Sequence, residues 1–234
     1  MPDYYDLKAR SCPSFLVLTA PALAVTCWFS DIDLKMVVPF GMASLLSVLV
    51  AQVGRDRGFS RQDWLFEQWG GAPTTRMLRH RDTVFDPRSL ANLHDKLSKR
   101  TNVPAPSKRK EEGDPQSADK VYEGYARHLR GVTREDKKKY SLVWIELCNY
   151  GFRRNLWGWR AYGLPLALLS LLAIIARLRF APYPPHVLVI AALVAALAAF
   201  WAFWVSPSWV KIPADAYAKR LLEAGFDLPD AHTP

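Results

Sequence analysis

The stretch VLVIAALVAALAAFWAFWV (residues 187–205) contains no Asp, Glu, Lys or Arg. A helix needs about 20 mainly apolar residues to cross the hydrocarbon core of a bilayer, with about 17 as the lower limit. This run meets that requirement. Its last residues are rich in Phe and Trp, as is common where a span reaches the membrane–water interface. The stretch therefore predicts a membrane-spanning helix.

Three further runs lack charged residues: SFLVLTAPALAVTCWFS (residues 14–30), MVVPFGMASLLSVLVAQV (residues 36–53) and AYGLPLALLSLLAIIA (residues 161–176). One such run alone is compatible with a buried helix of a soluble α-protein, but four runs in two close pairs favour two transmembrane hairpins. The first run is expected to be retained rather than cleaved as a signal peptide, because equal numbers of acids and bases precede it. We therefore expect an all-α, polytopic membrane protein with four spans, in hairpins 14–53 and 161–205.

Basic residues cluster at both ends of the polar segment between the hairpins, residues 54–160. They are Arg55, Arg57 and Arg61 at its start and Arg153, Arg154 and Arg160 at its end. Because Lys and Arg near span ends mark the cytoplasmic side, this segment and both termini (residues 1–13 and 206–234) are expected in the cytoplasm. The cysteines show no disulfide or zinc spacing, which fits that location.

The polar segment predicts a helical cytoplasmic domain, because no part of it alternates apolar and polar residues as a strand would. The composition of PAPSKRKEEGDPQ (residues 104–116) predicts a flexible loop. Apolar side chains then recur at helical spacing, and Gly151 is positioned to end the last helix. In the tail, residues 214–224 predict a short amphipathic helix.

The chain contains no nucleotide-binding, metalloprotease or hydrolase motif, so we expect no cofactor, metal site or catalytic residue. One set of candidate acid–base residues remains, consisting of His80, Asp82 and His94. Their spacing is not that of a known ligand set, and ion pairs on the surface are the simpler explanation.

A set of arginines in the polar segment has the chemistry to recognise phosphate through paired N–H donors. It consists of Arg76, Arg79, Arg81, Arg127, Arg130, Arg153 and Arg154. Three interpretations stay open. The set binds a specific anionic ligand, such as a phosphate-bearing small molecule. It is attracted to anionic lipid headgroups, at roughly 1 kcal/mol per basic residue. Or it forms structural ion pairs with nearby acids.

The stretch CNYGFRRNLWGWRAYG (residues 148–163) interleaves arginines with aromatic residues, as sites for single-stranded nucleic acid do. Its position beside a predicted span favours a membrane-interface elbow instead, so nucleic acid is not an expected partner. The elbow residues are Arg153, Arg154, Trp157, Trp159, Arg160 and Tyr162. In the last span, Ala191, Ala195 and Ala199 form a small-residue face suited to helix packing, in a homo-oligomer or within one protomer.

Two hairpins around a cytosolic segment resemble the layout of small transmembrane effectors of bacterial antiphage defence. The stretches LFEQWGGAPTTRMLRHRD (residues 65–82) and YGFRRNLWGWRAYG (residues 150–163) also resemble an uncharacterised family of bacterial inner-membrane proteins. The resemblance implies an oligomeric, non-enzymatic effector that alters the inner membrane when a cytosolic trigger, a protein or a small molecule, arrives. The alternatives are a membrane-anchored scaffold for cytosolic partners and an interfacial enzyme that uses His80, Asp82 and His94 on a lipid-like substrate.

Overall fold

The computed structural model describes residues 5–28 and 33–228 of the chain. Helices make up 81% of it, and the described ranges contain no strand, which confirms the all-α fold. The chain divides into two compact units. The first unit consists of Met1–Asp63 and Cys148–Val210, and the second unit consists of Trp64–Leu147 and Lys211–Pro234. Each unit is therefore assembled from segments that are distant in the sequence.

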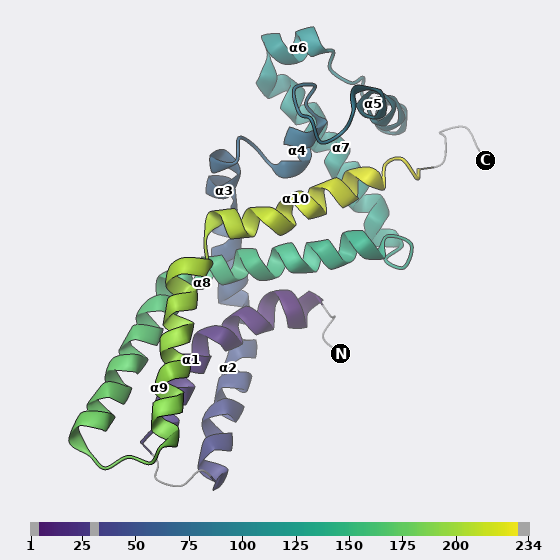
Figure 1. Ribbon diagram of the computed structural model, residues 1–234. Helices are drawn as coiled ribbons and strands as arrows, with labels where there is room; N and C mark the ends of the chain where they lie inside the picture. The colour runs from purple at the N-terminus through teal and green to yellow at the C-terminus, as the bar shows by residue number, and fades with distance from the viewer. Residues whose placement is uncertain (1–4, 29–32, 229–234) are drawn as a thin grey trace. The chain divides into compact units, whose positions relative to one another are not determined.

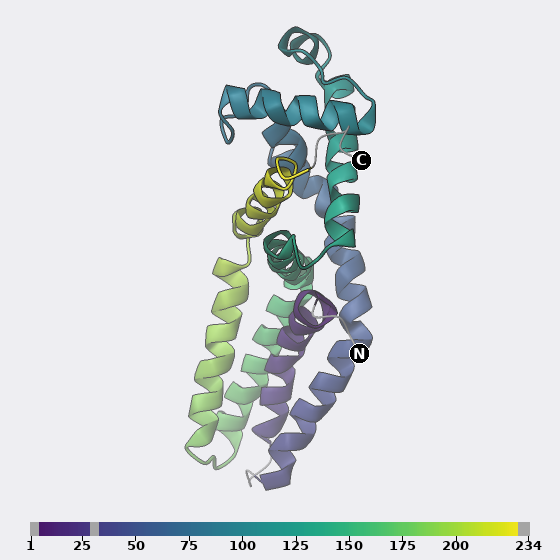
Figure 2. The ribbon, with the colours of Figure 1, turned by 90° about the vertical axis from the view of Figure 1, so that its right-hand side faces the viewer.

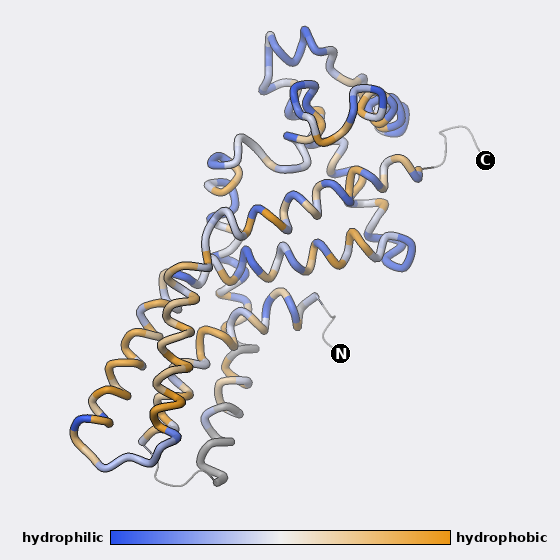
Figure 3. Tube along the Cα trace, in the orientation of Figure 1, coloured by the Kyte–Doolittle hydropathy of each residue, from blue (hydrophilic) through white to orange (hydrophobic). Residues whose placement is uncertain are grey.

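The first unit contains the apolar helices. They are η1 (Asp6–Ser11), α1 (Cys12–Thr26), α2 (Asp33–Ser60), α8 (Ser141–Phe180) from Cys148 onward, α9 (His186–Ala199) and η2 (Phe200–Trp204). α1 and α2 lie side by side, and the end of α8 forms a hairpin with α9 (Figures 1 and 2). Hydrophobic residues dominate this second hairpin along most of its length (Figure 3).

Within the described ranges, three helices are long and apolar enough to cross a membrane. They are Leu7–Thr26, Ser141–Phe180 and His186–Trp204. The predicted run at residues 36–53 lies in α2, which is not among the three, so the four-span arrangement stays a prediction. The link between α1 and α2 includes residues 29–32, which lie outside the described residues.

α8, α9 and η2 leave many large apolar side chains uncovered. These include Leu168, Leu169, Leu172, Ile175, Leu188, Val189, Leu193 and Phe203. In the predicted small-residue face, Ala195 and Ala199 are exposed and Ala191 is half-buried. The buried stripe of α9 is formed by other residues, Val187, Ile190 and Val194. Because monomeric soluble proteins rarely expose apolar patches of this kind, the surface requires lipid or another chain to cover it.

α2 and α8 approach each other most closely at glycines. A Cβ atom added at Gly158 would lie 2.9 Å from the backbone nitrogen of Gly58, and one added at Gly54 would meet the indole ring of Trp159. Gly58 also faces Asn155. The contacts 54–159 and 58–155 show that the two helices run antiparallel. Small residues permit such an approach of two backbones, as in many membrane helix pairs.

The second unit has its own hydrophobic core. Its helices are α3 (Gln62–Gln68) from Trp64, α4 (Pro73–Leu78), α5 (Pro87–Thr101), α6 (Lys108–Gly113), α7 (Pro115–Glu135), the start of α8, and α10 (Pro207–Glu223) from Lys211. The core includes Leu78, Leu93, Leu97, Tyr122, Tyr125, Leu129, Val143, Leu221 and Leu222. The tail helix therefore completes this core rather than standing apart from it. Asp86 caps α5 by accepting hydrogen bonds from the backbone N–H groups of Arg88 and Ser89.

Residues 104–116 are not the continuous loop that their composition predicts. Their middle forms α6, which Ser107 caps by accepting a hydrogen bond from the Lys110 N–H. The Glu111 side chain of α6 is buried and accepts hydrogen bonds from two partners described below. Local capping and these long-range bonds order a segment whose charge and proline content indicate the opposite.

The predicted helix end at Gly151 is also wrong, because α8 continues through it to Phe180. A Cβ atom at Gly151 would lie 2.9 Å from the Tyr5 hydroxyl and 3.0 Å from the Ala9 side chain. The glycine thus makes room for η1 instead of ending the helix. The elbow residues from Arg153 to Tyr162 accordingly lie within one uninterrupted helix. The tail helix begins at Pro207, earlier than the predicted position 214, because Ser206 accepts a hydrogen bond from the Trp209 N–H.

We predict opposite effects for alanine at two glycines of the first unit. Gly158→Ala forces α2 and α8 apart and should lower the free energy of unfolding by about 1–3 kcal/mol. Gly41 lies in α2, and no atom lies within 4 Å of the methyl group that alanine would add there. Gly41→Ala should therefore raise the free energy of unfolding by up to about 1 kcal/mol. Thermal unfolding of both variants in one detergent measures the difference. Shifts of the same sign and size would contradict the glycine contact.

Candidate functional site

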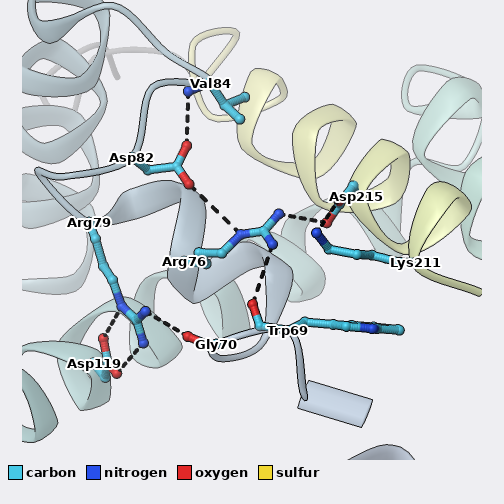
Figure 4. Close-up of polar contacts among 9 residues, drawn as sticks. All are labelled: Trp69, Gly70, Arg76, Arg79, Asp82, Val84, Asp119, Lys211 and Asp215. Atoms are coloured by element: carbon cyan, nitrogen blue, oxygen red, sulfur yellow. Dashed lines mark hydrogen bonds and ion pairs between the residues drawn. The ribbon is translucent and has the colours of Figure 1, made fainter. Parts of the chain in front are cut away.

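The guanidinium of Arg79 is held by an acid of the second unit. Its Nε and Nη2 atoms donate to the two carboxylate oxygens of Asp119 at 2.9 and 2.7 Å, and Nη1 donates to the Gly70 carbonyl at 2.7 Å (Figure 4). The bond to Asp119 raises the pKa of Arg79, and burial opposes this. Gly70 and Gly71 have φ values of +78° and +126°, and a Cβ at Gly71 would lie 2.8 Å from Nη2 of Arg79. The two glycines therefore let the loop close around the guanidinium.

Arg76 is also directed at carboxylates of the second unit. Its Nη2 atom donates to Asp215 of α10 at 2.8 Å, and its Nε lies 3.8 Å from an Asp82 oxygen (Figure 4). Lys211 approaches the other Asp215 oxygen at 3.8 Å. These contacts fasten the tail helix to α4 and to the turn that follows it. Arg76 and Arg79 thus have structural partners in the positions where a phosphate ligand would bind.

The other members of the predicted arginine set differ from these two. Arg81 and Arg127 are exposed and Arg130 is half-buried, and no hydrogen bond or ion pair joins any of them to another described residue. Arg153 and Arg154 belong to the first unit. The set therefore does not form one pocket in either unit.

The two candidate histidines are neighbours in the second unit, but Asp82 is not with them. The His80 and His94 rings are 5.2 Å apart, and their Nε2 atoms lie 2.9 Å from the carbonyls of Pro106 and Leu78. Asp82 instead accepts a hydrogen bond from the Val84 N–H and pairs with Arg76. The proposed acid–base trio is thus not brought together. Within the described residues, no group of three His, Cys, Asp or Glu side chains is arranged to hold a metal ion.

Glu111 joins this cluster, although its position in the predicted loop gave no reason to expect it there. Its Oε2 atom accepts hydrogen bonds from the His80 backbone N–H at 2.9 Å and from the Tyr122 hydroxyl at 2.8 Å. Burial and the bond to Glu111 raise the pKa of Tyr122, so its phenol stays protonated and donates. His94 stacks on Tyr122, and burial lowers the pKa of His94. The cluster stabilises the fold by linking α4, α5, α6 and α7.

Arg154 is the buried cation of the first unit. Only 3% of its surface is exposed, and its guanidinium carbon lies 3.9 Å from the centre of the Phe59 ring. Nη1 donates to the Gln62 side chain at 2.7 Å, and Nη2 donates to Asn155 at 3.1 Å. No carboxylate pairs with it among the described residues, so neutral acceptors and the faces of the Phe59 and Tyr150 rings compensate this charge.

Further arginine contacts join α8 to the end of α2 and to Arg61, the turn residue that follows α2. The guanidinium carbon of Arg57 lies 4.3 Å from the Tyr162 ring centre, and that of Arg61 lies 5.8 Å from the Trp157 ring centre. We call the residues that link α2 and α8 in this way the arginine–aromatic belt: Arg57, Phe59, Arg61, Arg154, Trp157 and Tyr162. The belt forms where the sequence predicts a membrane interface.

Two elbow residues contact the end of the second hairpin instead. Arg153 donates to the Trp209 carbonyl at 3.0 Å, and its guanidinium carbon lies 4.6 Å from the Trp209 ring centre. Arg160 donates at 2.9 Å to the Ala202 carbonyl in η2, a π-helical turn. Trp159 packs on Gly54, and its indole nitrogen has no hydrogen-bond partner. The elbow residues are therefore the contacts through which α8 holds α2 and the chain after α9.

Sequence reasoning singled out these side chains but missed their partners at the end of α2 and the start of α3. Phe59 and Gln62 carry no distinctive signal, since one aromatic and one amide residue are ordinary in a polar segment. The spacing Gly54-x-x-x-Gly58 is a recognisable sign of close helix packing and marks the place where α8 approaches.

No protein-family model matches the chain, and no curated protein or solved structure matches it.

Arg79→Gln should lower the free energy of unfolding by about 3 kcal/mol, because it leaves the Asp119 carboxylate partly buried without its paired donors. Arg81→Gln removes the same charge from an exposed side chain without a described partner. It should change the free energy of unfolding by no more than about 0.5 kcal/mol. Thermal unfolding of the full chain in detergent, followed by circular dichroism, compares them. A loss for Arg79→Gln no larger than that for Arg81→Gln would show that the pair contributes nothing.

The His94 environment predicts a loss of stability in acid. Because burial lowers its pKa in the folded chain, the unfolded chain binds more protons once the pH falls below the usual histidine pKa of about 6.5. Stability should therefore decline from pH 7 to pH 5. His80 and Glu111 face the ring and act in opposite directions. In His94→Gln this decline should be smaller, whereas His128→Gln, outside the cluster, should keep the wild-type slope. Equal slopes for all three proteins would exclude His94 as the source.

Proposed function

We propose that the chain is a non-enzymatic, multi-pass effector of the bacterial inner membrane, in which the second unit senses a cytosolic trigger and the helices of the first unit alter the membrane. One observation carries the proposal: α8 is a single helix of 40 residues, Ser141–Phe180. It contributes Val143 to the core of the second unit and buries Ile174 in the first. Because one helix contributes to both units, we infer that α8 is the segment through which a change around Val143 reaches the apolar helices.

The uncovered apolar side chains of α8, α9 and η2 support the membrane location. Phe203 is 85% exposed and Leu169 is 63% exposed, which is costly in water at about 25 cal/mol per Å² of apolar surface. Lipid covers such a surface, and contact with further copies of the chain covers part of it in an oligomer. The four-span topology with cytoplasmic termini, and the antiphage setting that the resemblance implies, belong to this proposal.

A scaffold is the second candidate function. The separate hydrophobic core of the second unit favours it, because a domain that packs by itself can recruit partners wherever it is anchored. Replacing the helices of the first unit with an unrelated four-helix anchor separates the two proposals. A scaffold keeps its activity after this exchange, and the effector loses it.

The effector proposal predicts unequal effects for two double substitutions. Arg153→Ala with Arg154→Ala removes the contacts to Trp209, Gln62 and Phe59. It should reduce the dye permeability caused by expressing the chain in bacteria several-fold, together with assembly of the purified protein. Lys137→Ala with Lys138→Ala removes the same charge, together with the contact of Lys137 with the Trp144 ring, and should leave both properties near wild type.

Dye uptake and particle size by size-exclusion chromatography check this prediction. Equal effects of the two double substitutions would refute the role given to α8. Wild-type chain that forms only monomers and leaves permeability unchanged on expression would refute the effector proposal itself.

A further inference from the structure

Two belt arginines at the end of α2 lack counter-ions. Arg57 lies in the last turn of α2 and Arg61 directly follows the end of this helix, so their like charges are close together in the chain and repel each other. Among the described residues, neither makes an ion pair, and the nearby acids Asp56 and Asp63 make none either. In the second unit, by contrast, Arg76 and Arg79 are paired with aspartates. An anion bound between the two belt arginines would relieve the repulsion.

Ring contacts hold these two guanidiniums in place and keep their donors available. Arg57 lies over Tyr162 and Arg61 over Trp157, so each cation is supported on one flat face. A ring contact uses none of the N–H donors of a guanidinium, which can still bind oxygen atoms in pairs. Arg57 is half-buried and Arg61 is exposed, so an anion has access to both.

The same face of α2 continues as an apolar track. Met42, Leu46 and Val53 precede Arg57 at helical spacing, and their exposed fractions are 57%, 41% and 45%. The face therefore changes from apolar to cationic along one helix. A free phosphate ion matches only the cationic end, whereas a phospholipid, with its acyl chains beside its headgroup phosphate, matches the whole face.

We propose that Arg57 and Arg61 bind the headgroup phosphate of an anionic phospholipid whose acyl chains lie along Met42, Leu46 and Val53 of α2. The site rests on the membrane location proposed above and specifies the lipid that the first unit selects. The belt then has two parts. Arg154 fixes α2 to α8 from inside, and Arg57 with Arg61 reads the lipid charge on the outside.

Native mass spectrometry of the full chain in detergent tests the site. The protein is titrated with phosphatidylglycerol or with phosphatidylcholine of the same acyl chains, and a third arm adds inorganic phosphate. We expect tighter binding of phosphatidylglycerol, weakened about thirtyfold by Arg57→Gln with Arg61→Gln, at roughly 1 kcal/mol per basic residue. Arg81→Gln with Arg127→Gln is the matched control. It removes the same charge from exposed side chains of the second unit and should leave the affinity unchanged.

Arg57→Gln with Arg61→Gln also removes two ring contacts. The variant Arg57→Lys with Arg61→Lys therefore serves as a second test of the role of charge. It keeps both charges and should bind phosphatidylglycerol within about threefold of wild type. A loss as large as that of the glutamine pair would overturn a site based on charge. Equal binding of the two lipids, equal loss in the control pair, or displacement of lipid by inorganic phosphate at matched concentration would also overturn it.

A carbonate wash of membranes from the expressing cells distinguishes failure of the lipid site from failure of the proposed function. If the chain stays in the membrane but shows no preference for phosphatidylglycerol, the lipid site is wrong and the membrane location stands. If the chain is washed off, the membrane location is wrong, and the lipid site falls with it.

Discussion

The backbone contact between Gly58 of α2 and Gly158 of α8 is the constraint on which the first unit depends. It brings the helices close enough for Arg154 to reach Gln62 and for Trp159 to lie on Gly54. A side chain at either glycine would separate the helices and leave the Arg154 charge buried without its acceptors. The belt therefore depends on the absence of side chains at Gly58 and Gly158 as well as on the arginines that form it.

The two units use arginine in opposite ways, and the difference follows from the available partners. In the second unit, Asp119 and Asp215 neutralise Arg79 and Arg76, so these charges hold helices together. In the first unit, aromatic rings and neutral oxygen atoms support Arg57, Arg61 and Arg154. A ring face stabilises a cation without cancelling its charge. The first unit thus keeps a positive edge suited to anionic lipid.

Periodicity predicted the all-α fold and much of the second core, because Leu93, Leu97, Tyr122 and Leu129 repeat at helical spacing and are buried. It failed where distant contacts decide the structure. Gly151 is ordinarily a helix end, but the close approach of η1 makes it an interior residue of α8. Glu111 lies in a charged, proline-flanked stretch, and its bonds to His80 and Tyr122 help the Ser107 cap to order that stretch. Neither the contact of Gly151 with η1 nor the bonds of Glu111 can be predicted from local composition, because the partner residues lie elsewhere in the chain.

We propose that α8 couples the two units, and interrupting this helix at the boundary between the units tests the coupling. The measurement is dye uptake by cells that express the chain with Gly-Ser-Gly-Ser inserted between Leu147 and Cys148. Both cores should remain intact, since each is packed within its own unit, and permeability should fall to that of cells without the chain. Permeability equal to that of the wild type, in a variant that still folds and enters the membrane, would contradict the claim.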